Sequence, residues 1–287
     1  MSGHRPKPLG GSFMLAFGTG STWRKEDPET LNTGLVDIVK EALLAGYRHL
    51  DTAELYNTER EVGEAIKQSG VPVSEIYITG KVFTTSDIKG AFDRTLHRLG
   101  VGYIDLYLLH HPYFGNTNAD LQAAWVELEA IYDSGKVGAI GVSNFTEAHI
   151  ETVLEIARIR PACNQIELNP YLQRTQLREY HKKHDIQTFA FSPLSPIVRA
   201  TPGPLDSELE SIAEKQGIST AVALIRWALQ QEIVVVTTST EKARMQDHLL
   251  ALNKSLPEQD VELISRVGSK KHFRGRWNDK FAAGDRN

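Results

Sequence analysis

The chain contains, at residues 46–66, the stretch GYRHLDTAELYNTEREVGEAI, which combines a strand pattern, a loop and a helix pattern. Residues 47–51 are interpreted as a short strand that ends at Asp51. Tyr56 follows in the loop. After it, Thr58 and Glu61 have the spacing of a Ser/Thr-x-x-Glu capping box, which starts a helix. A strand that brings a carboxylate and a phenol to one edge is a candidate corner of an active site, if other strands bring partners to that edge.

Seven further short strand patterns, alternating with helix patterns, occur along the chain. Their runs are almost continuously hydrophobic, which is typical of parallel strands that are covered on both faces. Alternation without a break in composition predicts a parallel α/β fold, and eight units favour a closed (β/α)8 TIM barrel over a doubly wound sheet. The predicted strands are residues 13–18, 47–51, 76–81, 103–110, 138–143, 162–167, 186–191 and 233–237.

Additions are expected at both ends of this barrel. Residues 9–12, Leu-Gly-Gly-Ser, predict the turn of an N-terminal β-hairpin, and Asp27-Pro28 predicts the start of the first helix. An extra C-terminal helix at residues 257–267 and a basic, aromatic tail follow the last barrel unit. Because no stretch has the composition of a linker, we expect residues 1–287 to form a single domain.

The overall composition restricts the class of partner. The chain has 287 residues, is 41% hydrophobic and 24% charged, and carries a net charge of −4, which gives no reason to expect nucleic acid or an anionic membrane as a partner. The single Cys163 cannot form an internal disulfide, which suits a reducing compartment. No apolar run approaches the roughly 20 residues that span a bilayer, and the first residues lack the apolar segment of a secretory signal. We expect a cytoplasmic monomer with a small-molecule partner.

Polar residues occur where the predicted strands end. The carboxyl ends of barrel strands form one rim, so these side chains are expected to meet. Each has a simpler interpretation on its own, as a helix cap, a solvated lysine or a core histidine, but together they could form a site. These residues are Asp51, Lys81, His110, Ser143, Asn144, Gln165, Glu167, Phe191, Ser192, Thr237, Thr238 and Ser239.

The chemistry of four of these groups is specific. A tyrosine with its ordinary pKa of about 10 is a poor acid at neutral pH. An ammonium beside the phenol of Tyr56, supplied by Lys81, would lower that pKa, and Asp51 would hold the lysine charged and in place. Tyr56 could then act as a general acid, and His110 could orient the oxygen that accepts the proton. The set is suited to protonating a carbonyl oxygen while hydride arrives at its carbon.

A hydride requires a donor, and the chain has no G-x-G-x-x-G between a strand and a helix. Gly18-Thr19-Gly20 is only a fragment of that motif, so a Rossmann site is not supported. A dinucleotide would have to lie across the rim of the barrel.

At these residues the sequence strongly resembles the aldo-keto reductases. Residues 46–66 resemble the first signature of that family, and DLYLLHHP, IGVSNF, NQIELNP and FSPL resemble later ones in the same order over nearly the whole chain. The resemblance implies a (β/α)8 barrel that binds NAD(P)H in an extended form and reduces aldehydes or ketones. It also implies the catalytic tetrad Asp51, Tyr56, Lys81 and His110, and no metal.

The resemblance also implies the cofactor contacts. Ser143, Asn144 and Gln165 would hold the nicotinamide carboxamide, and Phe191 replaces the tyrosine that usually stacks on the nicotinamide ring. The usual Pro-Lys-Ser of the adenosine-phosphate motif is Thr-Thr-Ser here, but Arg244 remains, so NADPH is expected rather than NADH. The full expected set is Gly20, Ser21, Thr22, Asp51, Ser143, Asn144, Gln165, Phe191, Ser192, Leu194, Thr237, Thr238, Ser239, Thr240 and Arg244.

Aromatic residues near the rim are expected to form the substrate pocket, although packing at the barrel top explains most of them equally well. Residues 238–239 and 277–278 are similar to a fungal branch that reduces conjugated polyketones and α-keto amides. Four basic residues of the tail, Lys270, Lys271, Arg274 and Arg276, are interpreted as solvated. The expected pocket residues are Trp23, His111, Tyr113, Phe114 and Trp277.

The sequence therefore predicts an NADPH-dependent reductase of activated ketones or aldehydes, of the α-dicarbonyl, α-keto amide or conjugated polyketone type. One alternative is a nicotinamide-binding accessory subunit of a membrane protein with the same fold, and another is a phosphate-binding barrel isomerase. Whether the loop at residues 195–206 closes over the cofactor is left open.

Overall fold

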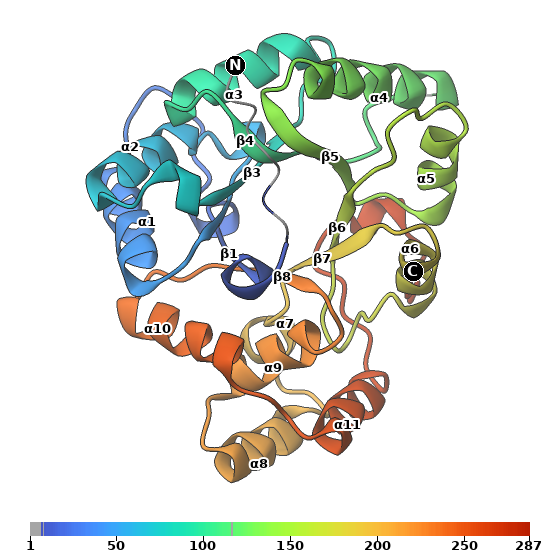
Figure 1. Ribbon diagram of the computed structural model, residues 1–287. Helices are drawn as coiled ribbons and strands as arrows, with labels where there is room; N and C mark the ends of the chain where they lie inside the picture. The colour runs from blue at the N-terminus through green and yellow to red at the C-terminus, as the bar shows by residue number, and fades with distance from the viewer. Residues whose placement is uncertain (1–6, 8, 116) are drawn as a thin grey trace.

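A computed structural model describes residues 7, 9–115 and 117–287 of the chain. Within these residues, parallel strands form a closed barrel in chain order, and helices surround it (Figure 1). This architecture confirms the predicted TIM barrel, and each strand begins and ends within two residues of the predicted bounds. The strands are β1 (Leu15–Gly18), β2 (His49–Asp51), β3 (Tyr77–Val82), β4 (Ile104–Leu109), β5 (Val137–Ser143), β6 (Cys163–Glu167), β7 (Gln187–Phe191) and β8 (Val234–Thr237).

The helices alternate with the strands, with two extra helices between β7 and the last barrel helix before β8, and the expected extra helix after α10. They are α1 (Thr33–Ala45), α2 (Glu59–Ser69), α3 (Ile88–Leu99), α4 (Asn118–Asp133), α5 (Glu147–Leu154), α6 (Thr175–Lys183), α7 (Ser195–Val198), α8 (Asp206–Gln216), α9 (Thr220–Leu229), α10 (Lys242–Leu250) and α11 (Glu258–Gly268). Short 3-10 helices include η1 (Gly11–Met14), η2 (Ser21–Trp23), η3 (Glu54–Tyr56) and η6 (Asn278–Lys280).

The predicted N-terminal β-hairpin is wrong for the part that the structure describes. Gly11 has φ of 54°, and the chain continues as η1 instead of reversing into a second strand. β1 pairs only with β2 and β8, both in parallel, among the described residues. The first arm of the hairpin would fall mostly on residues 1–6 and 8, which lie outside the described residues.

One predicted helix start and one predicted helix cap near the site are also wrong. α1 begins at Thr33, because Asn32 caps it by accepting the N–H of Leu35 at 3.1 Å, whereas Asp27 only closes a local turn. Thr58 precedes α2 but makes no capping bond. Its hydroxyl lies 2.9 Å from that of Thr19 instead.

The Glu61 carboxylate, which the predicted capping box would have used, accepts from Lys25 at 2.5 Å and from the backbone N–H of Asn32 at 2.7 Å. These contacts tie the loop after β1 to α2. Local capping is therefore replaced by long-range bonds that hold the loop in front of the barrel mouth.

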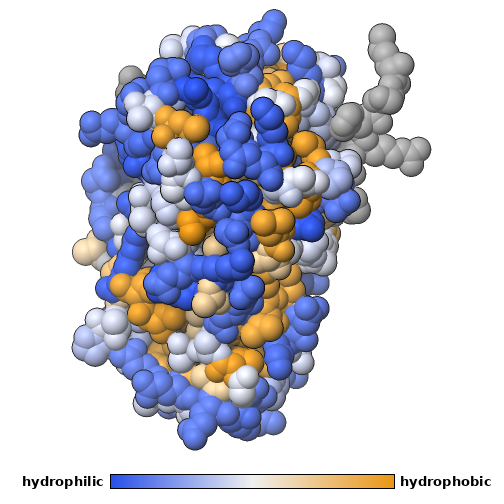
Figure 2. All heavy atoms as spheres, turned by 90° about the vertical axis from the view of Figure 1, so that its left-hand side faces the viewer, coloured by the Kyte–Doolittle hydropathy of each residue, from blue (hydrophilic) through white to orange (hydrophobic). Residues whose placement is uncertain are grey.

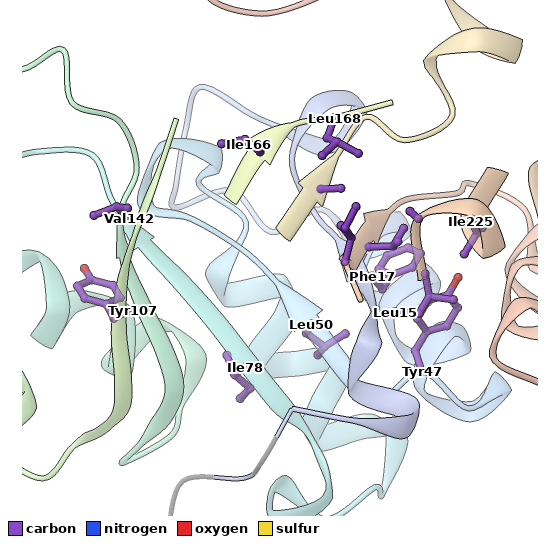
Figure 3. Close-up of a cluster of buried hydrophobic side chains, with 14 of the residues drawn as sticks. Leu15, Phe17, Tyr47, Leu50, Ile78, Tyr107, Val142, Ile166, Leu168 and Ile225 are labelled. Carbon is purple, nitrogen blue, oxygen red and sulfur yellow. The ribbon is translucent and has the colours of Figure 1, made fainter. Parts of the chain in front are cut away.

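The larger hydrophobic core lies between the strands and the surrounding helices. Residues on the outer faces of the strands, such as Leu50 and Ile78, point into it (Figure 3). Near Ile225 of α9, the Phe17 and Tyr47 rings meet edge to face with centroids 5.5 Å apart (Figure 3). Because this core buries the outer face of each strand, the inner face of each strand must point into the barrel.

The other face of each strand fills the barrel. A smaller cluster there includes Tyr77, Leu108, Cys163 and Phe189. Side chains from η1, which precedes β1, pack against this cluster. Because side chains alternate along a strand, residues an even number of positions further on also point inward, at the carboxyl ends. Those residues are Lys81, His110, Gln165 and Phe191.

The outer surface carries both hydrophilic and hydrophobic side chains. On the face that carries the left-hand helices of Figure 1, hydrophilic side chains predominate and hydrophobic groups lie between them (Figure 2). No helix in residues 7, 9–115 and 117–287 is long and apolar enough to cross a membrane.

Candidate active site

A buried ion pair lies at the carboxyl ends of β2 and β3. The Lys81 Nζ is 2.5 Å from Asp51 Oδ1, and the two residues are 0% and 2% exposed. Lys81 also donates to the carbonyl oxygen of Thr52 at 3.3 Å. An ammonium has three donors, and the third faces Tyr56, whose ring centroid lies 5.1 Å from the nitrogen. The parallel register therefore joins groups 30 residues apart.

Tyr56 ends η3, in the loop that follows β2. Its hydroxyl lies 3.4 Å from His110 Nε2, and the two rings meet nearly at right angles. A Cβ at Gly20 would lie 2.8 Å from Tyr56 Cζ, so only glycine allows the chain to pass this close to the phenol. Glu54, also in η3, accepts the backbone N–H groups of Phe83 and Thr84, both at 2.9 Å. The loop that carries Tyr56 is thus held at both ends of η3.

The electrostatics of the buried set differ in part from expectation. Burial raises the pKa of Tyr56, and the Lys81 ammonium lowers it less, so the net shift is upward rather than downward. Burial lowers the pKa of Lys81, but Asp51 and Tyr56 raise it more in sum, so the ammonium stays charged. Burial, and then Lys81, holds the pKa of His110 well below its usual range. At neutral pH the set is a protonated phenol, a neutral imidazole and an ammonium–carboxylate pair.

Amide and hydroxyl side chains continue from this pair along β5 and β6. Gln165 Nε2 donates to Asp51 Oδ2 at 2.8 Å, and Ser143 Oγ donates to the backbone oxygen of Gln165 at 2.8 Å. Asn144 Nδ2 donates to the His110 carbonyl oxygen at 2.9 Å. These bonds orient the three predicted carboxamide-binding residues beside the tetrad.

A cavity of about 840 Å³ opens above these groups. It lies within the range of about 300–1,000 Å³ that is usual for cofactor and ligand sites. All four of Ser21, Asn144, Ser192 and Trp277, which line it, have φ between 50° and 63°, a conformation that non-glycine residues adopt at a cost. Its lining comprises Gly18, Gly20, Ser21, Thr22, Arg24, Asp51, Leu55, Tyr56, Phe83, His110, Ser143, Asn144, Gln165, Phe191, Ser192, Pro193, Leu194, Ser195, Val198, Arg199, Val236, Thr237, Thr238, Arg276 and Trp277.

Three of the predicted cofactor residues lie outside this lining, beyond β8. Arg244 of α10 donates to Ser239 Oγ at 3.4 Å and to Thr240 Oγ1 at 3.3 Å. Its guanidinium also pairs with Glu241 at 2.9 Å, and both side chains are more than half exposed. The group lies at the start of α10, next in the chain to the lining residues Thr237 and Thr238.

The residues predicted for the substrate pocket lie in different places. Trp277 lines the cavity, but Trp23, His111, Tyr113 and Phe114 do not. Trp23 instead donates its indole N–H to Thr238 at 3.2 Å. The His111 and Tyr113 rings pack behind Trp277, with centroids 5.2 Å and 5.0 Å from it. His111 also packs against Phe83, with ring centroids 4.5 Å apart, so it contacts two residues that line the cavity.

The lining includes residues that the sequence did not single out. Arg24, Leu55 and Phe83 come from loops after β1, β2 and β3, and Arg276 comes from the tail. None of them ends a strand, so no periodic signal marks them. Adjacent Arg274 was interpreted as solvated, but it is 8% exposed and its guanidinium stacks on the Phe281 ring at 3.7 Å. Arg276 is exposed, yet it is part of the cavity wall.

The fold and the site together define a barrel oxidoreductase that acts on carbonyl groups. A parallel barrel brings an acid, a neutral imidazole and a buried ammonium to the floor of a cavity that suits a nucleotide. Comparison with known proteins gives the family.

A family model described as "Aldo/keto reductase family" matches residues 14–268, and the chain belongs to this family. It is 38% identical over 278 residues, 95% of this chain and 94% of the other, to 9,11-endoperoxide prostaglandin H2 reductase of Trypanosoma cruzi (strain CL Brener). It is 33% identical over 92% of this chain and 90% of the other to NADPH-dependent alpha-keto amide reductase of Saccharomyces cerevisiae (strain ATCC 204508 / S288c). A crystal structure of an aldo-keto reductase from a Medee basin deep-sea metagenome library superposes with a TM-score of 0.82 and 33% identity, over 92% of this chain and 94% of that chain. The protein is thus an NAD(P)H-dependent oxidoreductase of carbonyl compounds.

The resemblance seen in the sequence is confirmed at the level of the family. Similar proteins occur in a trypanosome and in a yeast, so membership of one fungal branch stays a prediction.

Proposed function

We propose that the protein is an NADPH-dependent reductase of activated ketones and aldehydes, of the α-dicarbonyl, α-keto amide or conjugated polyketone type. The observation that carries this proposal is the buried Lys81–Asp51 pair, 2.5 Å long, facing the phenol of Tyr56 on the floor of the cavity. The yeast relative, which reduces alpha-keto amides by its name, supports the substrate class.

In this mechanism Tyr56 is the general acid. Because its pKa is raised by burial, the phenol holds its proton at neutral pH until a carbonyl oxygen that gains negative charge draws it away. The resulting phenolate faces the Lys81 ammonium, which stabilises it, while Asp51 keeps the ammonium in place. The low pKa keeps the His110 imidazole neutral, with one N–H group. When Nε2 carries that proton, it can donate a hydrogen bond to the same carbonyl oxygen.

The residues present fit a nicotinamide cofactor, which when bound supplies the hydride. A carboxamide needs both acceptors and donors, and Ser143, Asn144 and Gln165 offer side chains of both kinds along one wall of the cavity. Phe191, which also lines the cavity, would stack on the nicotinamide ring. Ser192 and Leu194 would contact the pyrophosphate.

NADPH is proposed over NADH because of the polar group at the start of α10. Arg244, with Ser239 and Thr240 beside it, would bind the 2′-phosphate of NADPH. Its guanidinium would then pair with a doubly charged phosphate instead of with the exposed carboxylate of Glu241. Arg244→Gln should therefore raise the KM for NADPH about tenfold and leave the KM for NADH unchanged. Equal effects on both cofactors would reject this role.

The test of the proposed function is the loss of NADPH absorbance with α-dicarbonyls, an α-keto amide and simple aldehydes as substrates. Tyr56→Phe should lower kcat by about 10²- to 10⁴-fold, because it removes the acid. Binding of NADPH, measured by fluorescence quenching, should not change, because the phenol ring remains. Turnover by Tyr56→Phe at the wild-type rate would refute the mechanism. Cofactor binding without reduction of any carbonyl would favour an accessory nicotinamide-binding subunit instead.

We also propose that the protein acts as a monomer in the cytoplasm. The single cysteine, Cys163, is buried inside the barrel, which accords with a reducing compartment. Light scattering of the purified protein would test the monomer.

A further inference from the structure

The charges on the cavity wall are unbalanced. Its charged side chains are Arg24, Asp51, Arg199 and Arg276. The only carboxylate among them, Asp51, is already paired with Lys81 beneath the floor. The open part of the cavity therefore faces three guanidinium groups and no free carboxylate.

Two of these three cations lack an anionic partner among the described residues. Arg199 acts on the Glu167 carboxylate, so its charge is partly balanced. Within the residues that the structure describes, Arg24 and Arg276 make no ion pair. Arg276 has one weak side-chain contact, from its guanidinium to Ser21 Oγ at 3.5 Å.

Arg276 is held in place through its backbone rather than through its charge. Glu167, at the end of β6 and 2% exposed, accepts the backbone N–H of Gly275 at 2.8 Å and that of Arg276 at 2.9 Å, one with each carboxylate oxygen. Both oxygens of the Glu167 carboxylate are thus used by main-chain donors. The guanidinium reaches over the cavity toward Ser21 on the opposite loop, where it stays available to a ligand.

Both cations are near enough to the reacting groups to act on them electrostatically. Arg276 is close enough to Tyr56 to lower the pKa of the phenol, although burial raises it more. Arg24 contributes to the low pKa of His110, after burial, Lys81 and His111. Neither guanidinium hydrogen-bonds to Tyr56 or His110 among the described residues, so neither cation is occupied by the groups that would hold the reacting carbonyl.

We propose that Arg24 and Arg276 form a subsite for an anionic group of the substrate, a carboxylate several bonds from the reacting carbonyl. This inference rests on the proposed reductase function and names the substrate class of the same site. A guanidinium forms charge-assisted, often bidentate, hydrogen bonds to a carboxylate. Two of them at the mouth would select carbonyl compounds that carry a negative charge.

The phosphates of the cofactor share the same anionic chemistry, so the two sources must be separated. The residues proposed for those phosphates, Ser192, Leu194 and Arg244, follow β7 and β8. Arg24 follows β1, and Arg276 lies in the tail and contacts Ser21 of the loop after β1, which is itself among the expected cofactor contacts, so the Kd for NADPH has to be measured as well. Arg276 also directly precedes Trp277 in the chain, and both residues line the cavity. We therefore assign the two cations to the substrate.

The experiment compares 4-carboxybenzaldehyde with its methyl ester, using NADPH and the full-length wild-type protein. The two probes have the same shape around the aldehyde, and the ester group withdraws electrons more strongly, so intrinsic reactivity favours the ester. The wild type should nevertheless show a kcat/KM about tenfold higher for the carboxylate, a factor typical of one charge-assisted hydrogen bond. The preference should shrink as salt is added, because both guanidinium groups are exposed.

Arg24→Gln and Arg276→Gln should each raise the KM for the carboxylate about tenfold. The KM for the ester and the Kd for NADPH should change less than twofold by comparison. Arg266→Gln is the matched control, because it removes the same charge from exposed α11, away from the cavity. Near-UV circular dichroism and the melting temperature of each variant would show that it is folded.

The outcomes separate the inference from the function on which it rests. A rise in NADPH Kd with equal effects on both aldehydes would assign the guanidinium groups to the cofactor phosphates and overturn the inference. Reduction of both probes by the wild type without a preference for the carboxylate would also overturn it, while the proposed function stands. Reduction of neither these probes nor any other carbonyl would reject the proposed function itself.

Discussion

Replacing Lys81 by methionine tests the physical basis of the site. The substitution keeps an unbranched chain but removes an ammonium that is 0% exposed, and it leaves the Asp51 carboxylate, 2% exposed, in the barrel. The remaining side-chain donor to that carboxylate is Gln165 Nε2 at 2.8 Å. Removing one partner of a buried ion pair costs about 3–5 kcal/mol of stability. For a chain of this size the melting temperature should fall by roughly 10 °C.

A second variant separates stability from chemistry. Asp51→Asn combined with Lys81→Met removes both charges, so the buried carboxylate no longer lacks its counter-ion. The double variant should recover at least about half of the lost stability. Neither variant should regain activity, because no ammonium then faces Tyr56.

Calorimetry and urea unfolding at pH 7, followed by NADPH oxidation assays, would measure both effects. A Lys81→Met protein that melts within about 2 °C of the wild type would show that the pair is not buried as described. A double variant no more stable than the single one would show that the cost lies in packing rather than in charge. Wild-type activity in the double variant would remove the ammonium from the mechanism.

Four further predictions follow from particular contacts. Gly20→Ala would place a Cβ 2.8 Å from Tyr56 Cζ, so the phenol must shift and kcat should fall about tenfold or more. Glu167→Gln keeps the side-chain shape but has one acceptor for two backbone N–H groups, so the tail should loosen and the substrate KM should rise more than the NADPH Kd. Burial lowers the pKa of His49 to about 4, whereas the unfolded chain takes up a proton at this residue near pH 6.5. The contribution of His49 to stability is therefore complete above pH 6.5 and should decline by up to about 3 kcal/mol as the pH falls to 4, and His49→Gln should remove that part of the pH dependence. Residues 1–287 should unfold in one calorimetric transition, as expected of a single domain.

Each of these predictions has a control or a contradicting result. Gly102→Ala adds a Cβ with no atom within 4 Å and should leave kcat unchanged. A pH dependence of unfolding that is the same in His49→Gln as in the wild type would mean that His49 does not contribute to it. An unchanged substrate KM in Glu167→Gln would mean that the tail is held by other contacts, and two separate calorimetric transitions would contradict the single domain.

The rim of the barrel could be predicted because its geometry is periodic. Lys81, His110 and Gln165 lie at the ends of short apolar runs, and parallel strands end at one edge. Side chains alternate between the two faces of a strand, and this alternation decides which of them point into the barrel. That these polar groups meet at the rim could therefore be predicted without knowing where the helices lie.

Predictions from short local signals failed where long-range contacts compete with them. Thr58 and Glu61 have the spacing of a capping box, but Thr19, Lys25 and the backbone of Asn32 bind them instead. The side chains are the same in both arrangements. The tertiary contacts prevail because they tie two loops together as well as satisfying the polar groups.

The sequence by itself determined the barrel, the order of its strands and the polar groups on its rim, because these follow from hydrophobic periodicity and from the shared direction of parallel strands. Only the tertiary structure decided the wall of the cavity, where Arg24, Phe83 and Arg276 meet from loops and from the tail. It also decided the direction of the Tyr56 pKa shift, in which burial outweighs the ammonium of Lys81. Loop positions and burial depend on the packing of distant segments, and no period along the chain encodes them.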